Sequence, residues 1–321
     1  MSCGMTLAPS ERPALAVDVG GSKLAAAVVR RDGQLLASER MAVPHASSAD
    51  DLFATLEDLC RRVLHAADTD VVAIGVGCGG PMQYPAGRVS PLNIPLWRDF
   101  PLRDRLAAAF DLPCLVDNDA KALAVGECWQ GAGRGSKNML GMVVSTGVGG
   151  GIILDSRLLH GFAGNAGHIG HIVVWPDGPP CTCGARGCVE AVASGTGLTR
   201  RLGVALASGA RTRLVASATA AEIAQAARDG DALGQELLRT AGEAVGRGIA
   251  SAAALVDLEL VAIGGSIALR AWDVLGPPLL SELERSARLD FTRGLRVVHA
   301  QLGDAAGLYG AARLAFDSLE T

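Results

Sequence analysis

The sequence predicts an α/β protein built of two similar domains. Its 321 residues exceed the roughly 250 to 300 at which a single hydrophobic core usually stops growing. Short β-branched runs alternate along the chain with helix-like segments, which indicates layered α/β structure. A succession of strands joined by glycine turns occurs near the start of the chain and again near the middle, so the second half repeats the pattern of the first.

The first half opens on a glycine-turned hairpin. Residues 14–37 (ALAVDVGGSKLAAAVVRRDGQLLA) predict a strand, a glycine turn, a second strand, an Asp-Gly hairpin at Asp32 and Gly33, and a third strand. Residues 49–68 predict a helix, because their apolar residues repeat on one face, and residues 71–80 predict the next strand. The apolar face of that helix consists of Phe53, Leu56, Cys60, Val63 and Leu64.

The second half repeats this order at residues 139–161 (MLGMVVSTGVGGGIILDSRLLHG). A long helix near 231–256, a strand at 258–266 and a last helix near 306–318 follow. The repetition suggests duplicated domains closing on a nucleotide, although glycine-turned hairpins are common and the match can be coincidence. We expect a small first domain at 14–117, with residues 305–321 packed on it, a larger domain at 118–304, and a disordered extension at 1–13.

Composition argues against nucleic-acid and membrane partners. The 29 basic and 33 acidic residues give a net charge of −4 without a basic run, so phosphate-backbone binding has no electrostatic basis. No stretch approaches the roughly 18 apolar residues of a membrane span, and Met1 to Pro13 lacks the regions of a signal peptide. We expect a cytoplasmic protein. In a reducing compartment the scattered cysteines are small hydrophobes; these are Cys3, Cys60, Cys78, Cys114 and Cys128.

Two glycine-rich loops are candidates for phosphate binding. DVGGSK (Asp18 to Lys23) and STGVGGG (Ser145 to Gly151) present consecutive backbone amides that can surround an anion. Neither is a Walker A element, and the second leads into a strand instead of the helix that a dinucleotide fingerprint requires. Each loop can also be a plain tight hairpin. Asp18 can hold the water shell of Mg²⁺ beside bound phosphates.

Asn118 and Asp119 stand where a strand runs into a helix (LVDNDAKALAVGECW). Either can be an N-cap, but three polar residues at the carboxyl end of a strand favour a site. We expect the helix N-terminus to keep Asp119 ionised, so that it takes the proton of a substrate hydroxyl attacking a γ-phosphate. If the substrate is a sugar, Asn118 would hydrogen-bond it. The sequence gives no strong reason to assign a function to Asp117.

A histidine and three cysteines follow in the order H-x9-C-x-C-x4-C: His171, Cys181, Cys183 and Cys188. Cys3His is a closed, tetrahedral shell typical of structural zinc, and a disulfide or free thiols are the alternative. Nearby Glu190 and His168 would be held by the metal as sugar contacts. The alternative is that Glu190 caps or pairs on a helix and that His168 is an ordinary histidine.

The chain resembles the ROK family (repressors, uncharacterised reading frames and sugar kinases) of the actin-like ATPase superfamily over nearly all residues after Leu15. The motifs are DVGGSK, NDAKALAVGE, STGVGGGIILDSRLLHG, and GHIGH followed by CTCGARGCVEAVASG. SPLNIPLWRDFPL and VAIGGSIAL also look familial. The resemblance implies two actin-like, ribonuclease H-like α/β domains around an interdomain cleft, and ATP-dependent phosphorylation of a hexose, usually at the 6-hydroxyl. Homodimers or homotetramers are common in such proteins.

The resemblance also implies roles residue by residue. Asp119 matches the catalytic base. The sugar-contacting positions are Gly80, Asn93, Asn118, Asp119, His168, His171 and Glu190, with His171 also a zinc ligand. The nucleotide side comprises Asp18, Gly20, Gly21, Ser22, Lys23, Thr146, Gly147, Gly149, Gly264 and Gly265, and the implied cofactors are ATP, Mg²⁺ and structural Zn²⁺.

Three positions depart from the family pattern. Ser22 replaces a threonine, Lys121 replaces the second asparagine of N-D-x-N, and His168 replaces the glutamate of GE-x-GH. An imidazole offers one donor and one acceptor where a carboxylate accepts twice, which argues against plain glucose. The motifs AGHIGH and STGVGGG look most like those of bacterial N-acetylmannosamine kinases. From that resemblance we expect N-acetylmannosamine as the first candidate, glucose as the second and N-acetylglucosamine as the third.

Two other classes of protein compete with a kinase. A sugar-sensing repressor needs a helix-turn-helix module, and about a dozen residues before the first strand are too few for one. A catalytically silent sugar-binding protein would not need Asp18, Asp119 and both glycine loops. The sequence therefore favours an ATP-dependent sugar kinase.

Overall fold

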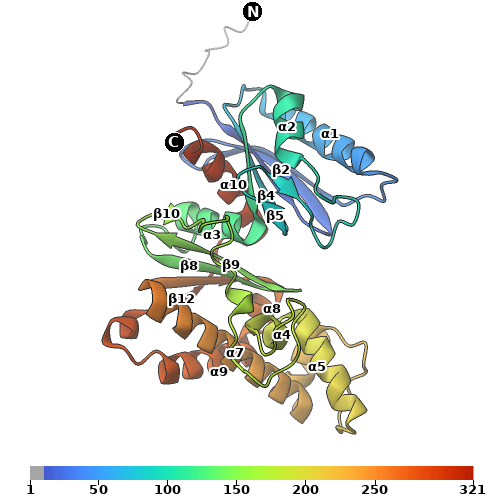
Figure 1. The fold of residues 1–321 in the computed structure, drawn as a ribbon, viewed down its shortest axis with the longest axis vertical. Coiled ribbons are helices and arrows are strands. Elements are labelled where there is room, and N and C mark those ends of the chain that lie inside the picture. The colour runs from blue at the N-terminus through green and yellow to red at the C-terminus, as the bar shows by residue number, and fades with distance from the viewer. Residues whose placement is uncertain (1–10, 321) are drawn as a thin grey trace, which may run out of the picture. The chain divides into compact units, whose positions relative to one another are not determined.

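The computed structural model describes residues 11–320 and divides them into two α/β units (Figure 1). The first unit holds residues 11–135, 160–166 and 304–320, and the second holds residues 136–159 and 167–303. The sequence places the boundary at 117/118, whereas the division falls after Gly135, because the intervening helix packs on elements of the first unit. Most of the extension expected at 1–13, with Cys3, lies outside the described residues.

The first unit is built on a sheet with the strand order β3-β2-β1-β4-β7. β1 is antiparallel to β2 and parallel to β4, and β4 is parallel to β7. The strands are β1 (Ala14–Val19), β2 (Lys23–Val29), β3 (Leu35–Ala42), β4 (Ile74–Cys78) and β7 (Cys114–Asn118), with a separate ribbon of β5 (Met82–Gln83) and β6 (Arg88–Val89). The helices are α1 (Ala49–Ala67), α2 (Leu102–Phe110), α3 (Asp119–Gln130) and α10 (Ala306–Asp317).

Both faces of this sheet are covered, as expected because successive apolar residues of β1 point to opposite faces of the sheet. Leu15 and Val17 belong to a core cluster with residues of α1, whereas Ala14 and Ala16 belong to a cluster with residues of α10. The small residues let α10 lie close against the strands, beside β1 and β4 although it comes last in the chain (Figure 1). α10 also packs on α3, so the helix that begins at Asp119 is fixed from two sides.

The second unit repeats the architecture. Its sheet has the order β10-β9-β8-β11-β12, with β8 antiparallel to β9 and parallel to β11, which confirms the predicted restart. The strands are β8 (Met139–Val144), β9 (Val148–Leu154), β10 (Arg157–Leu158), β11 (Leu260–Gly264) and β12 (Arg296–His299). The α-helices are α4 (Val189–Ala193), α5 (Gly195–Ala207), α6 (Ala220–Arg228), α7 (Ala232–Val256), α8 (Ser266–Arg270) and α9 (Trp272–Ser286).

Short 3₁₀ helices complete the description: η2 (Ile169–His171), η3 (Asp290–Gly294) and η4 (Gly303–Ala305). Over residues 11–320, none of the helices combines the length and the apolar character that a bilayer crossing would need.

Candidate active site

The carboxyl ends of β1, β4 and β7 meet at one edge of the first sheet, and polar side chains gather there. Asp18 of β1 lies opposite Gly77 of β4, which lies opposite Asp117 of β7. A Cβ added at Gly77 would lie 3.7 Å from Asp119 Cα and 3.9 Å from Asp18 Oδ1. The aspartates predicted to act as base and as magnesium ligand therefore flank one glycine, where no side chain separates them.

Asp119 is the first residue of α3, and Asn118 is its N-cap. The Ala120 amide donates to Asn118 Oδ1 at 3.0 Å and to Asp119 Oδ1 at 2.8 Å, so the capping role considered for Asn118 is real. Burial raises the pKa of Asp119, and the backbone amides of Ala120 and of Asp119 itself oppose that rise. Asp119 is nevertheless exposed, so neighbouring atoms desolvate the carboxylate without enclosing the residue. Their effect on the pKa outweighs that of the backbone amides at the helix N-terminus.

Asp18 is a second perturbed carboxylate. Burial first, and then the negative charge of Asp119, raise the pKa of Asp18 to about 6, while Lys23 and Arg40 act in the opposite direction. A Cβ at Gly307 would lie 3.0 Å from Asp18 Oδ2, so the first turn of α10 contacts the carboxylate closely. A cation beside this carboxylate would favour its ionised form.

The first glycine loop lies against the predicted sugar-side residues. The Gly20 amide donates to Lys23 O at 3.0 Å, which closes the turn between β1 and β2. A Cβ at Gly21 would lie 2.3 Å from Asn93 Cβ, and one at Gly80 would lie 3.6 Å from Asn118 Nδ2. Ser22, at the tip of the turn, is exposed. Lys23 Nζ pairs with Asp304 Oδ1 at 3.1 Å and thereby faces the start of α10.

The four predicted metal ligands come together in the second unit. Their ligand atoms all lie within 4.8 Å of one another, and His171 Nδ1 lies 3.7 Å from Cys181 Sγ, as Cys183 Sγ does from Cys188 Sγ. A tetrahedral ion with Zn–S bonds of about 2.3 Å places neighbouring sulfurs about 3.8 Å apart. None of the three cysteines is disulfide-bonded. We call these four residues the Cys3His cluster.

Tight backbone contacts shape the loop that carries the cluster. The Cys181 amide donates to Ala185 O at 2.8 Å, and Gly187 has a φ of +68°. A Cβ at Gly187 would lie 1.5 Å from Trp175 O, so only glycine fits there. Burial raises the pKa of Cys188 to about 12. A bound cation is the natural means of stabilising thiolates in such a place.

Glu190 connects the cluster to the second glycine loop. It lies in the first turn of α4, two residues after Cys188, and its Oε2 accepts a hydrogen bond from the Val148 amide at 2.9 Å. A Cβ at Gly147 would lie 2.8 Å from the same oxygen. This contact with a strand residue is neither the helix cap nor the helix pairing considered as the alternative, and the sugar-binding role stays a prediction.

His168 precedes η2, the single turn that ends at His171. The two imidazole rings stack at a centroid distance of 6.1 Å and an interplanar angle of 28°. His168 is exposed and therefore accessible to a ligand.

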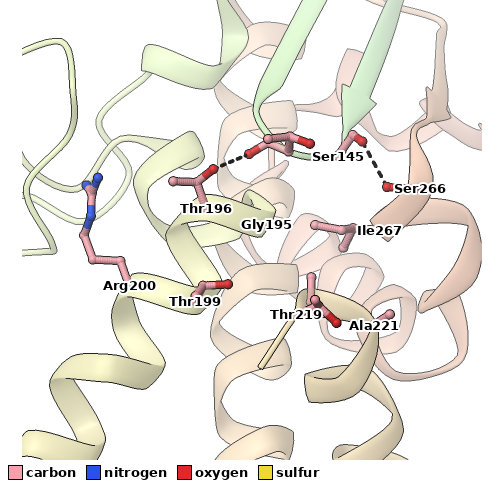
Figure 2. A pocket seen from close by; sticks show the side chains of 11 residues that line it. Ser145, Gly195, Thr196, Thr199, Arg200, Thr219, Ala221, Ser266 and Ile267 are labelled. Atoms are coloured by element: carbon pink, nitrogen blue, oxygen red, sulfur yellow. Dashed lines mark hydrogen bonds between the residues drawn. The ribbon is translucent and has the colours of Figure 1, made fainter. Parts of the chain in front are cut away.

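A cavity of about 640 Å³ lies wholly within the second unit (Figure 2). Its wall contains Thr146 and the N-terminal ends of α5 and α6. The Thr196 amide and hydroxyl both donate to Thr146 O, at 3.2 and 3.0 Å, and Ser145 Oγ lies 2.9 Å from Ser266 Oγ. The lining residues are Ser145, Thr146, Gly195, Thr196, Thr199, Arg200, Thr219, Ala220, Ala221, Ser266 and Ile267.

The sequence found only part of this wall. Thr146 lines the cavity, and Gly264 and Gly265 directly precede Ser266. A Cβ at Gly265 would lie 2.4 Å from Val144 O, so this glycine brings the turn close to β8. Gly147 and Gly149 are not among the lining residues. The contributions of α5 and α6 were missed, although the glycine and threonine at the start of α5, directly after a familial motif, were a usable signal.

Duplicated sheets, paired carboxylates at strand ends and a hydroxyl-lined cavity define a phosphotransferase with the actin-like ATPase fold. The chain belongs to the ROK family, whose model matches residues 14–318. It is 35% identical over 312 residues to a glucokinase of Halalkalibacterium halodurans, covering 94% of each chain. It is 40% identical over 260 residues to an N-acetylmannosamine kinase of Yersinia pseudotuberculosis, covering 79% of this chain and 83% of the relative.

A solved structure shares the fold over almost the whole chain. The ROK family glucokinase from Streptomyces griseus, in complex with glucose and AMPPNP, has a TM-score of 0.75 and is 33% identical. The match covers 95% of this chain and 99% of that one.

Proposed function

We propose that this protein transfers the γ-phosphate of ATP to the 6-hydroxyl of a hexose or N-acetylhexosamine, with N-acetylmannosamine the favoured sugar. At the coarser level the chain is a sugar kinase of the ROK family, because its full-length relatives are sugar kinases. The observation that carries the proposal is the placement of Asp119: a carboxylate with a raised pKa at the end of β7, beside Asp18 and Asn118.

Asp119 is the base in this proposal. As the sugar oxygen forms its bond to the γ-phosphorus, the bond between phosphorus and the bridging oxygen breaks and ADP leaves. The hydroxyl proton passes to the Asp119 carboxylate. A carboxylate whose pKa is raised by burial is a stronger base than a solvated one, which suits it to a weakly acidic alcohol.

Mg²⁺ fits the surroundings of Asp18. The carboxylate has a pKa of about 6 because burial and Asp119 disfavour its charge, and a cation beside it would reverse both effects. When bound, Mg²⁺ would neutralise charge on the phosphates of ATP. Lys23 and Arg40, both close enough to act on Asp18, add positive charge on the same side of the sheet.

Zn²⁺ fits the Cys3His cluster, whose donor set is a closed structural shell. In this proposal Zn²⁺ has a structural role. With the ligands fixed, the loop from His171 to Cys188 holds Glu190, and Glu190 holds the Val148 amide of the second glycine loop. The metal would thereby fix sugar-side and phosphate-side residues of the second unit together.

The cavity of the second unit is assigned to the nucleoside part of ATP. Its volume of about 640 Å³ lies within the range of small-molecule sites. The hydroxyl oxygens of Ser145, Thr196 and Thr199 offer acceptors, since the hydroxyls of Thr196 and Thr199 already donate to backbone carbonyls. Ile267 offers an apolar surface for a base.

The identity of the sugar rests on His168 and on the names of relatives. An imidazole at this position cannot accept from two hydroxyls as a carboxylate does, which argues against glucose. The 40% identity to an N-acetylmannosamine kinase supports that sugar in its place. Glucose is the second candidate because the relative that matches the greater share of this chain is a glucokinase. N-acetylglucosamine is the third.

A substrate panel tests the proposal. ADP release is measured with ATP and Mg²⁺ against glucose, mannose, N-acetylmannosamine and N-acetylglucosamine, and the products are compared with authentic 6-phosphates. We expect N-acetylmannosamine to give the highest kcat/KM. A higher kcat/KM for glucose would overturn the sugar assignment, and the absence of stimulation by any sugar would overturn the kinase itself.

A further inference from the structure

A group of buried charges lies beside the candidate site in the first unit, and the proposed mechanism does not use it. Asp117, near the end of β7, is 0% exposed, and Lys121, in the first turn of α3, is 2% exposed. Lys121 Nζ lies 3.5 Å from Asp117 Oδ1, and that oxygen also accepts a hydrogen bond from the Asn118 amide at 2.7 Å. A buried ion pair of this kind costs desolvation, so it calls for a reason.

Both charges also hold the segment formed by residues 160–166. Lys121 Nζ donates to Gly164 O at 2.7 Å. Asp117 Oδ2 lies 3.2 Å from His160 Nδ1, within ion-pair distance though not aligned as a hydrogen bond. Tyr84 supports the same segment, since its ring stacks on His160 at a centroid distance of 4.5 Å.

The segment is a small closed loop. The Ala166 amide donates to His160 O at 2.9 Å and so ties its two ends together. Gly164 has a φ of +74°, and a Cβ there would lie 2.3 Å from Tyr84 Cβ, so the loop fits only with glycine at this point. The segment is thus held at Gly164 by the buried Lys121 ammonium, and at His160 it lies against the buried Asp117 carboxylate.

The anchoring of segment 160–166 matters because the chain runs from it directly into the residues proposed to contact the sugar. The chain leaves the second unit after Leu159, forms segment 160–166 within the first unit, and returns at Gly167. His168 follows at once, and η2 with His171 comes next. Whatever fixes Ala166 therefore fixes the starting point of the stretch that carries the proposed sugar contacts.

We propose that Lys121, paired with Asp117, is a positioning residue that anchors segment 160–166 and thereby sets the affinity for the sugar. This inference rests on the proposed function. Lys121 stands where the family pattern has asparagine, and a lysine stem reaches farther than a short amide. Its ammonium donates a hydrogen bond to Gly164 O and at the same time neutralises the charge of Asp117.

The test compares variants by kinetics and by hydrogen exchange. In Lys121→Met, and in the charge-balanced double variant Asp117→Asn with Lys121→Met, we expect the amides of segment 160–166 to lose protection. We expect the KM for the sugar to rise on the order of tenfold to a hundredfold, because a displacement near 1 Å has effects of that size. The KM for ATP should change less than about twofold, and Lys121→Arg should recover part of the sugar affinity.

Arg247→Met is the matched control. Arg247 Nε pairs with the buried Glu282 at 2.9 Å in the second unit, so its loss also disturbs a buried carboxylate, but in the unit that does not contain segment 160–166. We expect lower stability and an unchanged KM for the sugar.

Two results would overturn the inference: unchanged protection of segment 160–166 in the Lys121 variants, or lost protection with an unchanged KM for the sugar. Failure of the kinase proposal has a different signature. In that case the wild-type protein phosphorylates no sugar, while the exchange measurement still shows whether Lys121 anchors the segment.

Discussion

Two carboxylates beside Gly77 account for most of the chemistry at the scale of single residues. Burial raises the pKa of Asp119 and raises that of Asp18 to about 6, so both hold protons more strongly than solvated aspartates do. For a base this is useful, because proton affinity is what it supplies. For a magnesium ligand it means that the ionised form, which its surroundings disfavour, gains stability when the cation is bound.

The pKa of Asp18 has a consequence for stability. Its folded-state pKa, about 6, lies above the ordinary value of 3.8. The associated stabilisation is therefore complete below 3.8 and is lost as the pH rises through about 6.

Asp18→Asn should remove this loss of folding stability at higher pH. Without Mg²⁺ or nucleotide, we expect the variant to be more stable than wild type at pH 8, by at most about 3 kcal/mol, and to differ little at pH 4. Chemical denaturation at the two pH values measures the difference. Asp58→Asn, on the exposed side of α1, serves as the control. An Asp18→Asn variant with the same stability increment at both pH values would contradict this account of the carboxylate.

At the scale of elements, the Cys3His cluster joins pieces that are too short to be stable alone. η2 has three residues and ends at His171, and α4 has five and begins directly after Cys188. Their packing depends on a loop with little regular structure, so an ion bound by all four side chains would supply the missing order. Glu190 would then transmit this order to the amide of Val148.

Metal removal tests that role. We expect purified protein to contain about one zinc per chain and Cys183→Ser to contain far less, with a lower melting temperature and faster exchange at the Val148 amide. Cys128→Ser, whose cysteine lies on α3 outside the cluster, should keep its metal. Full zinc occupancy in Cys183→Ser, or a wild-type protein that melts identically with and without a strong chelator, would refute the structural role.

The elements also show what could be predicted from the sequence. The hairpins at the start of each half, α1, α7, β11 and α10 follow from local periodicity and glycine turns, and the structure confirms each. The metal cluster was predicted because its ligands lie close in sequence. Of the cavity wall only Thr146 was predicted as a nucleotide contact, because Thr199, Thr219 and Ser266 come from other segments of the chain and join it only through packing.

At the scale of the whole molecule, one architecture occurs twice: both sheets have the same strand order and the same directions. The repeated glycine loops predicted this, since they mark the same turn in each copy. The role of Asp117 could not be predicted in the same way. Its partner His160 lies far along the chain and returns to the first unit through a short excursion that no local pattern reveals.

The central claim is that the Asp119 carboxylate removes the proton of a bound sugar as ATP phosphorylates it. The most direct measurement is the phosphorylation rate of Asp119→Asn with saturating ATP and the best sugar of the panel, alongside its affinity for that sugar. We predict a fall in kcat on the order of a thousandfold with a sugar affinity within a few-fold of wild type. A variant that binds the sugar normally and phosphorylates it at close to the wild-type rate would contradict the claim.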